Sequence, residues 1–312
     1  MTRILVTGAS GLIGAGTLPP LLASGREVHA VCSRVPPAAS PSEVHWHACD
    51  LLDAHGAAAL LRRVEPDELL HLAWYAEPGL FWSSPENLRW VEASLRLLRA
   101  FAEAGGRRAV LAGSCAEYAW QERTLCAERT TPCRPATLYG AAKHGLHVIA
   151  ESYAAQVGFS LAWGRIFLVY GPGEHEARLG GSVARALLRG EPALCSHGEQ
   201  RRDFIYSGDL ADAFVALLRS PVEGAVNVAS GRATTVRELV EALAKACGRP
   251  DLPRFGARPA VTGEPAELLA DITRLRDEVG WTPAATLEQR AHDAIEVWRA
   301  LLKSADPRRT PA

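Results

Sequence analysis

The stretch Thr7-Gly8-Ala9-Ser10-Gly11-Leu12-Ile13-Gly14 decides how the start of this chain folds. It follows a short apolar run at residues 4–6, typical of a buried parallel strand, and it precedes leucines at helical spacing that end at Gly25. In a strand–turn–helix unit, one glycine permits a tight turn, one lets backbone N–H groups approach a pyrophosphate, and one lets the helix pack closely on the strand. The pattern therefore predicts a dinucleotide-binding turn in which the cofactor contacts Gly8, Ser10, Gly11, Leu12, Ile13 and Gly14 at the helix N-terminus.

Strands and helices alternate along the first half of the chain. Apolar runs predict further strands over residues 27–31, 44–48, 69–73, 109–113 and 161–169, and residues 86–104 repeat apolar side chains at helical spacing. This alternation predicts an α/β fold with a doubly wound parallel sheet of the Rossmann type. Pro19 and Pro20 fall inside the first helix, where each lacks an N–H donor, so a distorted helix is expected there.

Composition narrows the class of protein. The chain has 312 residues with 34 basic and 35 acidic side chains, and without a long basic run this balance argues against nucleic acid as a partner. The N-terminus enters the first strand at once, and no apolar run reaches membrane-spanning length, so we expect a cytoplasmic protein without membrane contact. Seven cysteines without a Cys-x-x-Cys pair indicate reduced thiols and no metal site.

The end of the second strand indicates which dinucleotide binds. An acidic residue at this point receives the ribose hydroxyls of NAD, whereas an arginine accommodates the 2′-phosphate of NADP. The chain reads Cys32-Ser33-Arg34, so Ser33 and Arg34 predict NADP(H). If Arg34 is only a solvated loop residue, NAD(H) remains the alternative.

Two later strand ends face the same cofactor. Asp50 and Leu51 follow the third strand, and Ala73 ends the fourth, at the edge where ligands of open parallel sheets bind. Asp50 is placed to accept from the adenine amino group; alternatively, Asp50 or Asp53 is the N-cap of the next helix. The aromatic residues Trp74, Tyr75, Phe81 and Trp82 lie beside this edge and are suited to stack on a sugar, to line an apolar pocket or to pack in the core.

Tyr139 and Lys143 lie four residues apart in a predicted helix over residues 137–155, and therefore on one face of it. A nearby ammonium lowers the pKa of a phenol, which suits Tyr139 to exchange a proton with a substrate hydroxyl or carbonyl. Ser114 follows the fifth strand, and its hydroxyl can hold the same oxygen. Alone, the tyrosine–lysine pair is more typical of a solvated helix surface; together with the glycine turn and Ser114 it predicts a hydride-transfer site.

With these residues the chain resembles the extended short-chain dehydrogenase/reductase family, particularly its nucleotide-sugar branch of epimerases, dehydratases and 4-ketoreductases. The family's Gly-x-x-Gly-x-x-Gly falls on Gly8, Gly11 and Gly14, its Tyr-x-x-x-Lys on Tyr139 and Lys143, and its Ser/Thr on Ser114. The resemblance implies that Tyr139 is the acid/base, that Lys143 also binds the nicotinamide ribose, and that Ser114 orients the substrate oxygen.

The resemblance also implies a smaller, mixed C-terminal domain that binds the substrate. Residues 1–168 are then the dinucleotide-binding domain and 169–304 mainly the substrate-binding domain, with segments around 203–230 returning to the first domain and a flexible tail at 305–312. A homodimer built on the helices at 86–104 and 137–155 is expected on the same ground.

Further stretches resemble the parts of this branch that bind a nucleotide-diphosphate sugar. Tyr170-Gly171-Pro172-Gly173 resembles the entry into the substrate domain, and Arg202-Asp203-Phe204 resembles the Arg-Asp-Phe signature. The candidate substrate-binding residues are Ser114, Tyr75, Arg178, Arg202, Asn227 and Arg258. Arg178 is placed to meet the diphosphate, and Arg202 is expected to contact the nucleotide unless it pairs with a neighbour such as Asp203.

Departures from the family pattern separate the activities. A 4,6-dehydratase of this family carries an Asp-Glu pair directly after its catalytic threonine, whereas Cys115-Ala116 follows Ser114 here and Glu117 comes one position late. Because Ser33 and Arg34 favour an exchangeable NADPH, we expect NADPH-dependent reduction of a nucleotide-linked 4-keto-6-deoxyhexose to an alcohol. The alternative is a nucleotide-sugar 4-epimerase with tightly bound NAD; a non-catalytic protein of the same fold is less favoured, because the catalytic set is complete.

Overall fold

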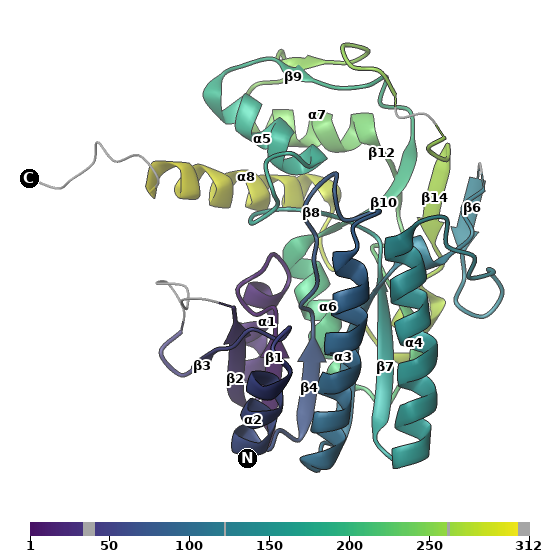
Figure 1. Ribbon diagram of the computed structural model, residues 1–312. Coiled ribbons are helices and arrows are strands. Elements are labelled where there is room, and N and C mark those ends of the chain that lie inside the picture. Colours follow the sequence, from purple (N-terminus) through teal and green to yellow (C-terminus); the bar gives the residue numbers. More distant parts are fainter. Residues whose placement is uncertain (34–40, 122, 261–262, 305–312) are drawn as a thin grey trace, which may run out of the picture.

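Seven parallel strands form the central sheet in the computed structural model, which describes residues 1–33, 41–121, 123–260 and 263–304 (Figure 1). Their order across the sheet is β11-β7-β5-β4-β1-β2-β3. These strands are β1 (Arg3–Thr7), β2 (Glu27–Cys32), β3 (His45–Ala48), β4 (Glu68–His71), β5 (Arg108–Ser114), β7 (Ser160–Ile166) and β11 (Gly224–Val228). The chain runs outward from β1 in both directions, so the sheet is doubly wound, which confirms the predicted fold class.

Helices cover both faces of this sheet because the strand side chains alternate between two apolar cores. Ile4 and Val6 of β1 belong to one core, and Leu5 between them belongs to the other. The first core includes side chains of α1 (Gly14–Ala23) and α6 (Ser207–Arg219). The second includes side chains of α2 (Ala54–Val64), α3 (Glu86–Glu103) and α4 (Leu138–Val157). Continuous apolar strands are what a sheet covered on both faces requires.

A smaller sheet has the order β12-β10-β14-β6, and β8 also pairs with β10. Its strands are β6 (Arg123–Cys126), β8 (Leu168–Tyr170), β10 (Arg201–Tyr206), β12 (Ala233–Thr235) and β14 (Glu267–Ala270). The sheet is mixed, because β10 runs antiparallel to β12 and parallel to β14 and β8. A third apolar core joins it to α5 (Leu179–Arg189), α7 (Val236–Cys247) and α8 (Leu287–Ser304). Short elements are the strand pair β9 (Ala193–Leu194) and β13 (Pro253–Arg254), the 3-10 turn η1 (Cys115–Glu117) and the π-helical turn η2 (Arg274–Glu278).

Each sheet takes one strand from the other side of residue 168: β6 belongs to the smaller sheet and β11 to the central one. β6 lies within residues 1–168, yet it pairs with β14 in the smaller sheet. Within residues 203–230, α6 and β11 lie with the central sheet, whereas β10 belongs to the smaller one. The strand expected over residues 161–169 is two strands, β7 and β8. The expected tail at 305–312 lies outside the described residues.

Two sequence expectations concern helices. Pro19 and Pro20 do lie inside α1, but the helix continues through both to Ala23. Leu18 and Leu21 of α1 pack in the first core, and this packing offsets the hydrogen bonds that the two prolines cannot donate. In the described ranges, no helix has the length and apolar character needed to cross a membrane.

His71 links β4 to β1 and α3 in the interior. Its Nδ1 lies 2.6 Å from Thr7 Oγ1, and its Nε2 lies 2.8 Å from Ser94 Oγ. Ser94 Oγ donates to Trp90 O, so it accepts from the Nε2–H of His71, and Nδ1 accepts from the Thr7 hydroxyl. The ring is therefore neutral, and burial lowers the pKa of His71 to about 3, with the nearby Lys143 acting in the same direction. Because Thr7 precedes Gly8, this neutral ring also fixes the start of the glycine turn.

Replacement of His71 by asparagine is expected to reduce the loss of stability in acid. The unfolded chain binds a proton at His71 near pH 6.5, whereas the folded chain binds it only near pH 3. The free energy of unfolding therefore falls as the pH drops below the unfolded pKa, by up to about 1.4 kcal/mol per pH unit from this group. Urea unfolding at neutral and mildly acidic pH should show a larger loss for the wild-type protein than for His71→Asn. Equal losses would mean that His71 is protonated in the folded state.

Candidate active site

The glycine turn connects β1 to α1 beside the end of β4. Gly8 has a φ of +68°, which favours glycine, and a Cβ there would lie 2.8 Å from Ala73 N. A Cβ on Gly14 would collide with the Gly8 carbonyl oxygen, so the start of α1 packs directly on the turn. These approaches place the exposed residues Ser10 and Gly11, with the half-buried Leu12 and Ile13, at the N-terminus of α1. This arrangement fits the phosphates of a dinucleotide.

The acidic residues after β3 have different roles. Asp53 accepts from His55 N and Gly56 N and is the N-cap of α2. Asp50 is exposed and accepts from Leu52 N at 2.9 Å, and Leu51 is buried. The predicted N-cap role therefore belongs to Asp53, and contact of Asp50 with the adenine stays a prediction.

The remaining predicted cofactor contacts lie at two strand ends. Ser33 is exposed at the end of β2, whereas Arg34 lies outside the described residues. Ala73 follows β4, and its backbone N–H donates to Thr7 Oγ1 at 3.3 Å. Ala73 thus lies against the glycine turn, as a residue at the dinucleotide edge should.

Ser114, Tyr139 and Lys143 come together where β5 ends and α4 begins. Gly140 makes this approach close, because a Cβ there would collide with Ala116 O. Ser114 lies close enough to Tyr139 to lower the pKa of its phenol. Lys143 Nζ donates to Ala112 O at 2.8 Å and lies 3.7 Å from the centre of the Trp74 ring. Tyr139 can therefore exchange a proton with a substrate oxygen, and Ser114 can donate a hydrogen bond to the same oxygen.

Burial shifts the two titratable groups of this site in opposite directions. It raises the pKa of Tyr139 to about 12, against the hydrogen bond from Ser114 and the positive charge of Arg178. It lowers the pKa of Lys143 to about 7, against the negative charge of Glu117. We expected Lys143 to lower the pKa of Tyr139; in the structure the cation with that effect is Arg178. The reason is that Lys143 turns its ammonium to the Ala112 carbonyl oxygen and the Trp74 ring.

Aromatic side chains enclose Tyr139. The ring of Phe81 meets it edge-on at 4.8 Å between centroids, and Trp82 does so at 5.7 Å. Tyr139 N also donates to Trp82 O at 3.1 Å, which fixes this segment at the start of α4. Arg178 lies 5.5 Å from the centre of the Phe81 ring and reaches the same place from the start of α5. Of the predicted aromatic cluster, Phe81 and Trp82 therefore lie at the catalytic tyrosine.

Two predicted substrate contacts, Arg202 and Asn227, are buried in the structure. Arg202 is buried; its Nη1 donates to Arg201 O at 2.9 Å and its Nη2 lies 3.1 Å from the Glu264 carboxylate. The alternative of an ion pair was right in kind, but the partner is Glu264 rather than Asp203. Asn227 is fully buried and binds Tyr118 Oη and the Cys126 and Asp271 carbonyl oxygens. Asn227 is not open to a substrate, because partners distant in sequence already use its polar atoms, whereas contact of Arg202 with the nucleotide stays a prediction.

The other predicted substrate residues remain accessible. Tyr75 is half-buried just after Trp74, and Arg258 is exposed in the loop after β13. The backbone N–H of Arg258 donates to Cys195 O at 3.1 Å. Contact of these two residues with the substrate stays a prediction.

Comparison with known proteins decides the family. The model described as the NAD dependent epimerase/dehydratase family matches residues 4–229. The chain belongs to this family. It is 29% identical to the UDP-glucose 4-epimerase of Mycolicibacterium smegmatis over 312 residues, which cover 95% of this chain and 98% of that protein. It is 30% identical to the dTDP-6-deoxy-L-talose 4-dehydrogenase (NAD(P)(+)) of Kitasatospora kifunensis over 321 residues, or 96% and 95% of the two chains.

Among solved structures, the UDP-glucose 4-epimerase of Thermus thermophilus in complex with NAD is similar along nearly the whole chain. The TM-score is 0.84 at 28% identity, and the match covers 96% of this chain and 99% of that chain. These matches confirm the predicted nucleotide-sugar epimerase/dehydratase branch of the extended short-chain dehydrogenase/reductase family.

Family motifs do not account for Glu117, a residue of the site to which no role was assigned from the sequence. Its carboxylate is fully buried and accepts from Ser114 N at 2.8 Å, Trp163 Nε1 at 2.8 Å and Arg165 Nε at 2.9 Å. The Ser-x-x-Glu spacing of Ser114 and Glu117 is a capping-box signature and was the available signal. Arg165, on β7, had no such local signal.

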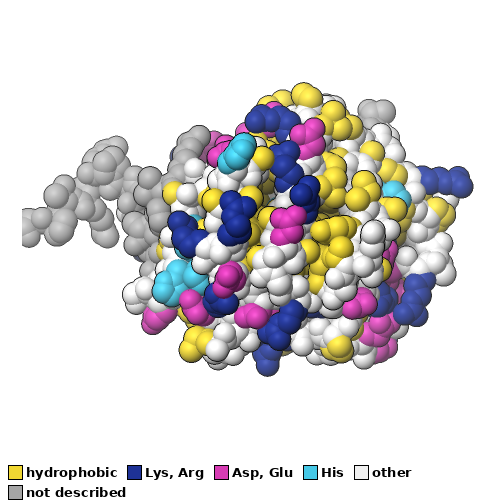
Figure 2. Space-filling view, turned by 60° about the horizontal axis from the view of Figure 1, so that its bottom comes forward, with side chains coloured by type: hydrophobic (Ala, Val, Ile, Leu, Met, Phe, Trp, Pro, Cys, Tyr) yellow, Lys and Arg dark blue, Asp and Glu magenta, His cyan; other side chains and the backbone are white. Residues whose placement is uncertain are grey.

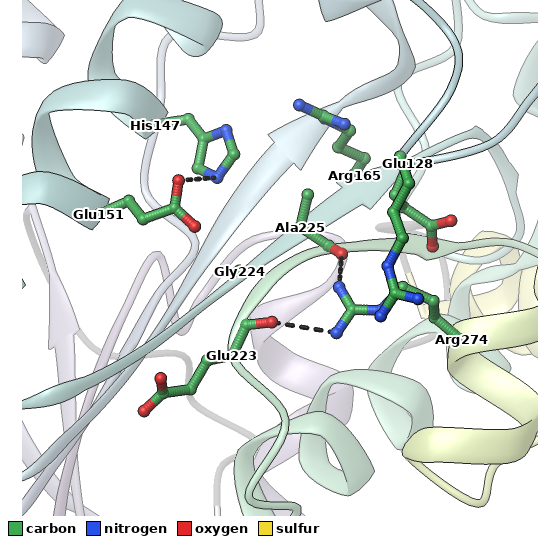
Figure 3. A pocket seen from close by; sticks show the side chains of 9 residues that line it. Glu128, His147, Glu151, Arg165, Glu223, Gly224, Ala225 and Arg274 are labelled. Atoms are coloured by element: carbon green, nitrogen blue, oxygen red, sulfur yellow. Dashed lines mark hydrogen bonds and ion pairs between the residues drawn. The ribbon is translucent and has the colours of Figure 1, made fainter. Parts of the chain in front are cut away.

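A cluster of possible metal ligands and a cavity lie near this site, but neither belongs to it. Ligand atoms of Glu117, His144 and His147 lie within 4.8 Å of one another, but the Arg165 guanidinium already neutralises Glu117, so the group does not fit a cation. A cavity of about 330 Å³, shown in Figure 3, is lined by Glu128, Arg129, His147, Glu151, Arg165, Glu223, Gly224, Ala225 and Arg274. None of Ser114, Tyr139 and Lys143 lines it, so it is not the family's catalytic pocket.

Gly140→Ala is expected to lower both stability and activity, because its Cβ would meet the Ala116 carbonyl oxygen and push α4 away from Ser114. We expect a destabilisation of about 1–3 kcal/mol from this overpacking. Gly145→Ala, on the same helix, is the matched control. A Cβ there meets nothing within 4 Å, so this change should raise stability by up to about 1 kcal/mol. Thermal unfolding and NAD(H) titration of both variants measure the difference; equal behaviour would contradict the close approach.

Proposed function

We propose that this protein is a nucleotide-sugar 4-epimerase that uses NAD(H). The observation that carries the proposal is the close packing of α4 on the end of β5, which brings Tyr139 and Lys143 to Ser114 at the carboxyl edge of the sheet that carries the glycine turn. The 4-epimerases of Mycolicibacterium smegmatis and Thermus thermophilus support the choice, because each matches nearly the whole chain. The proposed cofactor contacts are the glycine turn from Gly8 to Gly14, with Asp50, Leu51, Ala73 and Lys143.

The catalytic side chains have separate tasks in this proposal. A bound nicotinamide dinucleotide would accept the hydride from C4 of the sugar and return it. Tyr139 takes the proton of the C4 hydroxyl on oxidation and gives one back on reduction. Ser114 donates a hydrogen bond to the same oxygen, and Lys143 binds the nicotinamide ribose. Tyr139 is protonated at neutral pH, so its action as a base depends on Ser114 and on the positive charge of Arg178, both of which lower its pKa.

The substrate in this proposal is a nucleotide-diphosphate sugar. Arg178 supports it, because its guanidinium lies beside Phe81 and acts electrostatically on Tyr139, which places a positive charge near the reacting end of a bound sugar. Phe81 and Trp82 then enclose the sugar ring, and Tyr75 and Arg258 are proposed as further contacts. We also propose a cytoplasmic location, because none of the seven cysteines, all within the described residues, is in a disulfide.

Reduction of a nucleotide-linked 4-keto-6-deoxyhexose by NADPH is the second candidate. Two observations favour it. The Kitasatospora kifunensis relative, at 30% identity, is a 4-dehydrogenase whose name gives NAD(P)(+) as its cofactor. The sequence after β2 is Cys32-Ser33-Arg34, without the acid that receives the ribose hydroxyls of NAD.

Cofactor consumption separates the two candidates. The protein is incubated with UDP-glucose or UDP-galactose without added cofactor, and separately with NADPH or NADH and 4-keto-6-deoxysugars linked to dTDP, CDP, GDP or UDP. We expect epimer formation in the first assay without a net change in nicotinamide absorbance. If no epimer forms in the first assay and NADPH is lost stoichiometrically in the second, the protein is the reductase and the epimerase proposal is wrong.

Tyr139→Phe should lower kcat by at least about 100-fold in whichever assay is active, because it removes the proton donor and acceptor. Tyr153→Phe, on the same helix, is the matched control, because its ring packs on Phe159 rather than at the site. A Tyr139→Phe enzyme with unchanged kcat would contradict the assignment of Tyr139.

We propose a homodimer through α3 and α4, which pack against each other. Both helices expose apolar side chains: Leu88 is 56% exposed, Val148 52% and Ile149 49%. Figure 2 shows a face of the molecule where apolar side chains gather among charges of both signs. Such exposed apolar groups on paired helices suit a self-complementary interface.

Ile149→Glu is expected to convert the dimer to a monomer in sedimentation analysis, because it places a charge in the apolar interface. Val297→Glu, an equally drastic change at an exposed position of α8, should leave the dimer intact. A wild-type protein that sediments as a monomer would overturn the proposal.

A further inference from the structure

A buried ion pair lies directly behind the catalytic serine. The Glu117 side chain is fully buried, the Arg165 side chain is only 3% exposed, and Arg165 Nε lies 2.9 Å from Glu117 Oε2. A buried ion pair often stabilises a fold no better than apolar side chains of the same volume would, so stability alone is a weak explanation for this pair. Its contacts therefore indicate what it does.

Glu117 holds the backbone of Ser114, and the backbone N–H of Ala116 holds the Ser114 hydroxyl. Ser114 N donates to Glu117 Oε1 at 2.8 Å, and Ala116 N donates to Ser114 Oγ at 3.2 Å. Because Ser114 Oγ accepts from Ala116 N, the hydroxyl oxygen is held in place and its hydrogen is available to another oxygen. Ser114 is also the side chain that lowers the pKa of Tyr139.

The chain makes room for this arrangement at Gly113. A Cβ on Gly113 would collide with Trp163 Nε1 and lie 2.7 Å from Glu117 Oε1. Trp163 Nε1 donates to the same Glu117 oxygen at 2.8 Å. A side chain at position 113 would therefore displace the Glu117 carboxylate and the Trp163 indole from the end of β5.

Arg165 ties the carboxylate to the rest of the fold. Its Nη1 donates to Tyr118 Oη at 3.0 Å, and Tyr118 Oη donates to Asn227 Oδ1 at 2.8 Å. Asn227 is on β11, so the network connects the end of β5 to β7 and β11, the two strands beyond it in the sheet. Each member is buried and hydrogen-bonded, as a rigid polar network requires.

We propose that Glu117, held by Arg165, is a positioning residue for C4 chemistry: it fixes the backbone and hydroxyl of Ser114 and places a negative charge near the Lys143 ammonium. The proposal rests on the proposed function and adds a residue to its machinery. Glu117 touches neither substrate nor cofactor in this role; it acts through Ser114 and through its charge.

Glu117→Gln is the direct test, because the amide keeps the size and removes the charge. We expect kcat to fall by about 100-fold while KM for the sugar nucleotide changes little, since a misplaced Ser114 affects the reacting atoms more than binding. Loss of the negative charge should also move the alkaline limb of the kcat pH profile to lower pH, because the Lys143 ammonium loses its stabilising neighbour. An unchanged kcat, or an unchanged pH profile, would overturn the proposal.

Asp209→Asn is the matched control for loss of a buried charge. Asp209 is 5% exposed, and its Oδ2 accepts from Arg290 Nε at 3.0 Å, in an ion pair that joins α6 to α8 and shares no residue with the Glu117 network. This variant should lose stability but keep its kcat. If kcat falls equally in Asp209→Asn, the loss in Glu117→Gln is explained by general destabilisation, and the positioning role is wrong.

Trp163→Phe keeps the test decisive if Glu117→Gln does not fold, because it removes a hydrogen bond to Glu117 and retains both charges. We expect kcat to fall several-fold with unchanged KM, and hydrogen exchange of the peptide that contains Ser114 to accelerate. No change in either measurement would overturn the proposal. Failure of the proposed function is distinguishable, because the wild-type enzyme would then be inactive in both assays, whereas the exchange at Ser114 would still report whether Glu117 holds it.

Discussion

The register of β1, β4 and β5 determines where the chemistry can occur. Thr7, the last residue of β1, is paired with His71, the last residue of β4, and His71 is paired with Leu111, from which β5 continues to Ser114. Parallel strands direct their carboxyl ends to one edge, where the glycine turn, Ala73 and Ser114 then emerge together. The neutral His71 ring fixes this register from inside, through Thr7 on β1 and Ser94 on α3. Without that alignment, the cofactor turn and the catalytic serine would not face one site.

The fold and the close approach of the candidate catalytic residues could be predicted from sequence because their signals are local. The turn after β1 has its glycines within one strand–turn–helix unit, and the spacing of Tyr139 and Lys143 is that of one helix. The errors concern partners distant in sequence. Arg202 is buried against Glu264, Asn227 against Cys126 and Asp271, and β6 pairs with β14. No local pattern carries these pairings, so a polar residue in a substrate-binding motif was assigned to the ligand when the fold itself uses it.

The catalytic trio alone does not distinguish an epimerase from a reductase. Both need a proton at the C4 oxygen and a hydride at C4, and Ser114, Tyr139 and Lys143 serve either direction. The difference lies in what surrounds them. An epimerase must present both faces of C4 to one nicotinamide, so its keto intermediate needs room to turn, and it must retain its cofactor. Here Phe81 and Trp82 meet Tyr139 edge-on, and the strand end at Ser33 carries no acid for the ribose. The space beside Tyr139 and the contacts to the adenosine ribose are therefore the properties that decide the activity.

The candidate site contains buried charged side chains, which are unfavourable for folding unless each has a partner. Lys143 lies under Trp74 with its ammonium on a backbone carbonyl oxygen, and Glu117 and Arg165 are removed from water nearby. In an apolar core such groups would destabilise the fold unless each had a partner, and each of them has one. In this low-dielectric setting, a carboxylate acts more strongly on a neighbouring ammonium than it would in water. The same burial that lowers the stability of the charged forms thus makes the charges effective on Ser114, Tyr139 and Lys143.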